Sequence, residues 1–152
     1  MSFSCGTSTS DDTKLVATEI INLQEANPII KSYLILKDNL VETNGKKARN
    51  SAQNFLKVTK SASGDGVELM RKAAENIANT DDVEIQRENF ETVSDNLYIY
   101  AQDNDMGILL YRQHCPMAFK NNGASWLSAE SKIMNPYFGD KMLHCGTVED
   151  EF

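Results

Sequence analysis

A chain of 152 residues, 41% of them hydrophobic, is long enough for one domain with a substantial core. Its formal net charge of −7 argues against nucleic acid as a partner, because the phosphates would repel it, and against adsorption to anionic lipid. No run of about 18 apolar residues occurs, so the sequence predicts no transmembrane segment.

Residues 1–13 contain a single cysteine, Cys5, beside small residues and ahead of a polar run. This arrangement is similar to the cleavage site of a bacterial lipoprotein. On this interpretation, residues 1–13 are a flexible tether with a lipid anchor at Cys5. The protein would then be a periplasmic or outer-membrane-anchored lipoprotein of a Gram-negative bacterium, in a compartment where disulfides persist. The alternative is a free cysteine on a disordered terminus.

Residues 14–105 have the periodicity of amphipathic helices. A first, weaker helix is predicted around residues 15–23. Asn27-Pro28 is a start signal for the next helix, which should end before Asn44-Gly45. The helix after that carries Ala48, Ala52, Phe55, Leu56 and Thr59 and should stop at the break Ser61–Gly64. Two further helices are predicted to open with capping boxes, one formed by Asp65 with Glu68 and one by Asp81 with Glu84.

Short loops between such helices predict an up-down bundle of four main helices. The charged pairs Arg71-Lys72 and Arg87-Glu88 are expected on solvated outer faces. The positions predicted to face the core are Ile30, Tyr33, Leu34, Lys37, Leu40, Val41, Ala48, Ala52, Phe55, Leu56, Thr59, Val67, Met70, Ala74, Ile77, Ile85, Phe90, Val93, Leu97 and Tyr100.

Residues 106–152 lose the helical period, and we expect an ordered but mostly irregular wrap against the bundle. A short strand is predicted at 108–111, with residues 142–148 pairing against 108–114. Trp126 should be a wedge whose indole N–H reaches a carbonyl, and Asn135–Gly139 should form a turn. The predicted fold is therefore mainly α, with residues 14–152 as one domain whose wrap contains one β-hairpin or strand pair.

Sulfur-containing residues bracket this wrap in mirror-like order, Cys115 and Met117 near its start and Met142 and Cys145 near its end. Thiolates and thioethers are soft ligands that select Cu(I) and similar ions. If the two ends meet, these four residues predict a low-coordinate Cu(I) or Ag(I) site. His114 and His144 are additional candidate ligands, and the two histidines with the two thiolates would suit Zn(II) instead.

A disulfide between Cys115 and Cys145 explains the same pattern without metal. It would close a loop of 31 residues and contribute on the order of 3–4 kcal/mol in the chain-entropy model. Met117 and Met142 would then be ordinary core residues, since methionine fills irregular gaps. The two states can also alternate, with metal bound only after reduction. Lys141 could lower the pKa of a neighbouring thiol.

The segments His114–Phe119, Gly123–Ser128 and Ile133–Gly146 resemble a family of bacterial helical domains of unknown function. That family occurs as secreted stand-alone proteins and as an extra domain on membrane-fusion subunits of copper/silver efflux pumps. The resemblance extends over about 29–148, and its most specific part is the tail. It implies a periplasmic role in heavy-metal handling, with an efflux membrane-fusion subunit as a partner.

The sequence therefore predicts a periplasmic module that binds or transfers Cu(I) or Ag(I). The alternative is a non-catalytic structural or interaction domain, closed by a Cys115–Cys145 disulfide, that partners an envelope or efflux protein. The sequence contains no Ser/His/Asp set, glycine-rich phosphate loop or HExxH motif, so we expect no enzymatic activity.

Overall fold

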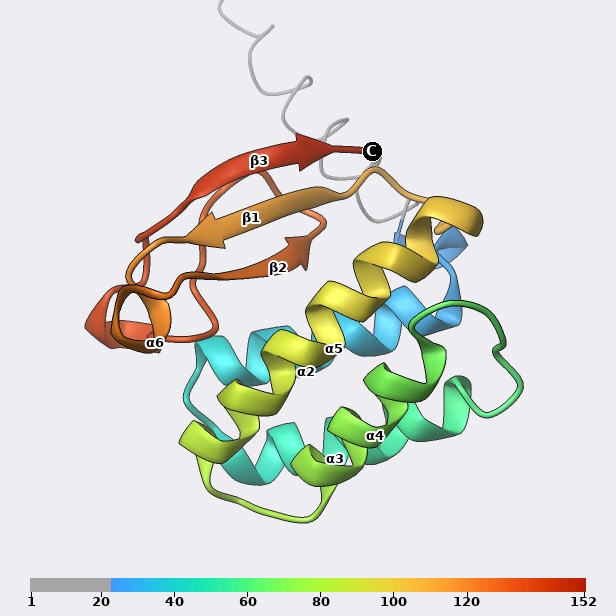
Figure 1. Cartoon of the computed structure of the whole chain (residues 1–152), viewed down its shortest axis with the longest axis horizontal. Helices are drawn as coiled ribbons and strands as arrows, with labels where there is room; N and C mark the ends of the chain where they lie inside the picture. The colour runs from blue at the N-terminus through green and yellow to red at the C-terminus, as the bar shows by residue number, and fades with distance from the viewer. Residues whose placement is uncertain (1–22) are drawn as a thin grey trace, which may run out of the picture.

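The computed structural model describes residues 23–152, and four of its helices form an up-down bundle (Figure 1). They are α2 (Pro28–Val41), α3 (Gly45–Val58), α4 (Val67–Ala78) and α5 (Val83–Asp103). The mainly helical fold is confirmed. Cys5 and almost all of the helix predicted around residues 15–23 lie outside the described residues. Among the residues described, no helix is both long and apolar enough to cross a bilayer.

Local capping explains where these helices begin. The Asn27 side chain accepts a hydrogen bond from the Ile29 amide at 2.9 Å, and the Asn44 side chain accepts one from the Lys47 amide at 3.0 Å. The capping residue of α5 is Asp82, one position later than predicted, and its carboxylate accepts from the Glu84 amide at 2.9 Å.

The capping box predicted for Asp65 and Glu68 is wrong. Helix α4 begins after Gly66, which has a φ of 82° and makes no side-chain capping bond. A Cβ at Gly66 would lie 2.8 Å from the carbonyl oxygen of Asn96 in α5. Close approach of the two backbones therefore selects glycine here, and a tertiary contact decides this helix start.

Most of the predicted core positions are buried, but two predictions about α5 are wrong. Ile85 is 45% exposed, whereas Arg87, predicted to be solvated, is only 2% exposed. The Arg87 guanidinium donates to the carbonyl oxygens of Pro136 at 2.8 Å and Leu40 at 3.0 Å. It thereby joins α5 to the end of α2 and to the C-terminal wrap.

The predicted wrap is present, and it contains a three-stranded antiparallel sheet, one strand more than the predicted strand pair. Its strands are β1 (Tyr111–Cys115), β2 (Ala124–Ser128) and β3 (Thr147–Glu151), in the order β2-β1-β3. The predicted strand at 108–111 is shifted by three residues, and β2 was not predicted. All five residues of β2 are buried, so this strand lacks the polar alternation by which strands are recognised.

The sheet lies beside α5 (Figure 1), and two buried tyrosines join the layers. The Tyr33 hydroxyl of α2 accepts from the Leu127 amide at 3.0 Å and bonds the Ser94 hydroxyl at 2.7 Å. Burial raises the pKa of Tyr33 well above its usual value, so it stays neutral. The Tyr137 hydroxyl donates to the Ser125 carbonyl at 2.6 Å.

Trp126 is a buried wedge, as predicted, but its indole N–H has no hydrogen-bond partner. Its ring makes an edge contact with Tyr137, with centroids 6.0 Å apart, and Tyr137 packs in turn on Phe90 of α5. Packing of the rings therefore sets the position of this side chain, and the predicted bond to a carbonyl is wrong.

Candidate functional site: a contact between two cysteines

Cys115 ends β1, and Cys145 lies two residues before β3. Because β1 and β3 pair antiparallel, with His114 opposite Thr147, the end of one strand lies beside the start of the other. The Sγ atoms of Cys115 and Cys145 are 3.1 Å apart, and both cysteines are free. The fold thus brings together the two sulfurs that the sequence places 30 positions apart.

Asn135 holds the segment that carries Cys145. Its side chain is fully buried and accepts hydrogen bonds from the amides of Tyr137 at 2.8 Å and Phe138 at 3.2 Å, which forms the predicted turn. The same side chain donates to the Cys145 carbonyl at 2.8 Å, and the Asn135 amide donates to the Leu143 carbonyl at 2.7 Å. The buried side-chain amide of Asn135 thus links the turn to the backbone of Cys145.

Gly146 allows the close approach of this segment to the sheet. Its φ is 141°, a conformation that favours glycine. A Cβ there would lie 2.8 Å from the His114 carbonyl oxygen and 3.1 Å from the Trp126 ring. A side chain at position 146 would therefore push Cys145 away from Cys115.

The two thiols differ in exposure and share a hydrogen bond. Cys115 is fully buried, whereas Cys145 is half-buried and gives the pair access to solvent. The hydrogen bond to Cys115, followed by burial, raises the pKa of the Cys145 thiol. The pKa of Cys145 is therefore raised, and not lowered as predicted from Lys141, so a smaller fraction of this thiol is thiolate at neutral pH.

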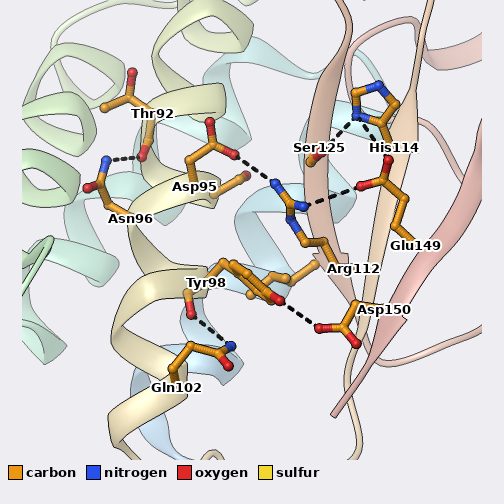
Figure 2. Close-up of polar contacts among 12 residues, drawn as sticks. Thr92, Asp95, Asn96, Tyr98, Gln102, Arg112, His114, Ser125, Glu149 and Asp150 are labelled. Atoms are coloured by element: carbon orange, nitrogen blue, oxygen red, sulfur yellow. Dashed lines mark hydrogen bonds and ion pairs between the residues drawn. The ribbon is translucent and has the colours of Figure 1, made fainter.

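Neither histidine joins the sulfur pair. The His114 ring bonds the Ser125 hydroxyl at 2.8 Å and lies 4.0 Å from the Glu149 carboxylate (Figure 2), and the His144 ring bonds the Ile133 carbonyl at 2.9 Å. Over residues 23–152, no group of three or more His, Cys, Asp or Glu side chains is placed to hold a metal ion. The His114 side chain lies away from the sulfur pair because neighbouring residues of a strand point to opposite faces of the sheet.

Each thioether residue lies two or three positions from one of the cysteines in the sequence, and neither is fully buried. Met117 is 47% exposed and precedes the short turn α6 (Ala118–Asn121). Met142 is partly buried and follows the 3-10 turn η1 (Gly139–Lys141). Neither methionine therefore belongs to the buried core.

Comparison with known proteins places the helices in a family. A family model described as "Protein of unknown function (DUF3347)" matches residues 29–107, just over half of the chain. The chain belongs to this family. No curated protein and no solved structure matches the chain.

The DUF3347 match spans α2 to α5 and ends before β1. It therefore covers the scaffold of this DUF3347 protein and not the tail segments that carry Cys115 and Cys145. The features on which the tail resemblance rested lie beyond the matched residues.

Sequence reasoning missed a polar cluster that joins the sheet of this DUF3347 protein to α5 (Figure 2). The Arg112 guanidinium lies 3.3 Å from the Glu149 carboxylate and 3.9 Å from that of Asp95, and it covers the Tyr98 ring at 4.7 Å. The Tyr98 hydroxyl donates to Asp150 at 2.6 Å. Arg112 alternates with buried Gln113 along β1, but both residues are polar, so the sequence contained no signal for this cluster.

Burial raises the pKa of Asp95, and the nearby positive charge of Arg112 opposes this effect. The cluster joins α5 to β1 and β3, and thus supports the strand that leads out of Cys145. Arg112 lies near both the Glu149 carboxylate of β3 and the Asp95 carboxylate of α5, and so links the sheet to the bundle.

Proposed function

We propose that this protein binds a soft monovalent cation, Cu(I) or Ag(I), through the thiolates of Cys115 and Cys145. The observation that carries the proposal is the 3.1 Å contact between their sulfur atoms, which come from opposite ends of the sheet region. Thiolates prefer soft cations. The half-buried Cys145 gives an ion a route to the buried partner.

A low coordination number fits the neighbouring residues better than a tetrahedral zinc site. Structural zinc takes four Cys or His ligands in most sites, whereas among residues 23–152 no third such ligand joins the two cysteines. Metal–thiolate bonds of about 2.3 Å require the sulfurs to separate beyond their present contact. Met117 and Met142, each close in sequence to one of the cysteines, would complete or gate the site.

The same sulfur contact favours a second candidate function, a non-catalytic interaction domain closed by a Cys115–Cys145 disulfide. The oxidised pair has no thiolate to offer, so metal binding and disulfide formation exclude each other. Mass analysis after alkylation, with and without prior reduction, distinguishes them. A disulfide that persists in the reducing buffer of the metal experiment would favour the second candidate.

We also propose a setting for this activity. The tail resemblance and the N-terminal Cys5 support a periplasmic protein with a lipid anchor, acting beside the membrane-fusion subunit of a heavy-metal efflux system. Pull-down with such a subunit in the presence and absence of Ag(I) tests this partnership. Equal recovery with a Cys115→Ser/Cys145→Ser variant would separate partner binding from metal binding.

Replacing both cysteines, as Cys115→Ser/Cys145→Ser, should abolish competition for Cu(I) against a chromogenic chelator under reducing conditions. All proteins should carry Cys5→Ser so that no other thiol contributes. Met117→Leu/Met142→Leu should weaken binding by about tenfold, as loss of a supporting group does at other metal sites. The matched control is Met134→Leu, a partly buried methionine of the same region. Retained Cu(I) binding by the double serine variant, with an unchanged helical CD spectrum, would reject the site.

The affinity for Ag(I) should rise with pH across the neutral and mildly alkaline range. The ligand is the thiolate, and the pKa of Cys145 is raised above its ordinary value, so protons compete with metal. Competition titrations at a series of pH values measure this dependence. Cys145→Ser should bind more weakly and show a shallower pH dependence. A pH-independent affinity in the wild-type protein would contradict thiolate ligation by Cys145.

A further inference from the structure

A cavity of about 280 Å³ lies beside the segments that carry the sulfurs. Four separate parts of the chain contribute to it: the start of α5, the α6 turn, the turn after Asn135, and η1. Figure 1 shows α6 and the segment that contains η1 at the same end of the molecule. The residues that line it include Arg87, Phe119, Lys120, Tyr137, Phe138 and Lys141.

The walls of this cavity are aromatic and its rim is cationic. Phe119 and Phe138 are partly buried, and the Phe119 ring makes an edge contact with Tyr137 at a centroid separation of 5.4 Å. Lys120 and Lys141 are both exposed. The one acidic lining residue is Glu84, whose carboxylate is already bound by Arg87 at 2.9 Å. Two lysine charges therefore remain for a ligand, in a chain whose net charge is −7.

The α6 turn holds its cavity-lining side chains in an unfavourable backbone conformation. Phe119, Lys120 and Asn121 have consecutive φ values of 52°, 56° and 67°. The left-handed region costs an L-residue with a large side chain about 1–2 kcal/mol. Of these three residues, only Asn121 is a residue type that often adopts the left-handed conformation. Such strain is concentrated at binding and catalytic sites, and here it places Phe119 against the cavity and Lys120 at its rim.

We propose that this cavity binds a small organic anion with one apolar ring, such as an aromatic carboxylate. The ring would lie among Phe119, Tyr137 and Phe138, and the carboxylate would lie between the ammonium groups of Lys120 and Lys141. The volume is at the lower end for ligand pockets, which fits a single ring. The proposal does not depend on metal binding, because none of its residues is a cysteine or methionine.

Fluorine NMR of 4-fluorobenzoate tests the proposal on the whole chain. We expect saturable binding with a dissociation constant on the order of 1 mM. Lys120→Gln/Lys141→Gln should weaken binding by about fivefold, the loss expected for two exposed ion pairs. The matched control is Lys46→Gln/Lys47→Gln, which removes two exposed charges at the start of α3 and should leave binding unchanged.

Two further probes separate ring recognition from charge alone. The neutral 4-fluorobenzamide should bind more weakly than the carboxylate and equally to the wild-type and Lys120→Gln/Lys141→Gln proteins. Inorganic phosphate alone should not displace fluorobenzoate at matched ionic strength. Displacement by phosphate, or equal loss of binding in both lysine double variants, would overturn the proposal. Absence of saturable binding to the wild-type protein would overturn it as well.

Discussion

Replacing Arg87 with methionine is expected to lower the free energy of unfolding by about 3 kcal/mol. The side chain is 2% exposed and donates hydrogen bonds to the carbonyls of Pro136 and Leu40. Methionine would fill much of the space but would leave both buried carbonyls without a donor. Urea unfolding followed by CD measures the change, with the midpoint falling at a constant slope.

The matched control is Glu84→Gln. The Glu84 carboxylate bonds Arg87 at 2.9 Å but its side chain is 67% exposed, so its loss should cost less than about 1 kcal/mol. Arg87→Lys should also lower the free energy of unfolding, by more than Glu84→Gln does. Lysine lacks the planar guanidinium group that donates to several acceptors at once. If Arg87→Met costs no more than Glu84→Gln, the buried hydrogen bonds do not hold the wrap to the bundle.

The second large effect is expected from Asn135→Ala, which should destabilise the protein by about 2–4 kcal/mol and weaken Ag(I) binding. The substitution leaves the amides of Tyr137 and Phe138 and the carbonyl of Cys145 without their partner. Freed from this bond, the Cys145 segment should spend less time beside Cys115. Urea unfolding and competition for Ag(I) measure the two losses.

Asn135→Asp separates the two roles of this side chain. The carboxylate still accepts from the amides of the turn but no longer donates to the Cys145 carbonyl. We therefore expect Asn135→Asp to keep more stability than Asn135→Ala, and to lose a similar part of the Ag(I) affinity. Equal Ag(I) affinity in the wild-type protein and both variants would mean that Asn135 supports the fold without positioning the thiol.

The parts of the fold that could be predicted from sequence are those decided by neighbouring residues. Asn27 and Asn44 each cap a helix by accepting a hydrogen bond from an amide two or three positions later. Both partners therefore lie in the same short stretch of sequence. Arg87 was misjudged because Leu40 and Pro136, its partners, are more than 40 positions away. The start of α4 depends on Asn96, which is 30 positions from Gly66.

The candidate site likewise combines features that the sequence could predict with features that depend on distant residues. The mirror-like order of cysteines and methionines predicted that the ends of the tail meet, and the sulfurs of Cys115 and Cys145 do lie in contact. The alternation of side chains along β1 places His114 and Cys115 on opposite faces, which a correctly placed strand would have predicted. The tie from Asn135 to Cys145 had no local signal, because it joins two loops through a backbone carbonyl.

The close packing at Gly146 has a practical consequence. Trp126 is the single tryptophan of the chain, and its ring borders the residue that follows Cys145. Its indole N–H is buried and unbonded, so its emission should respond to small changes in local polarity and contact. The protein therefore carries an intrinsic fluorescent reporter close to the thiols, and the proposed ion binding can be tested in unlabelled material.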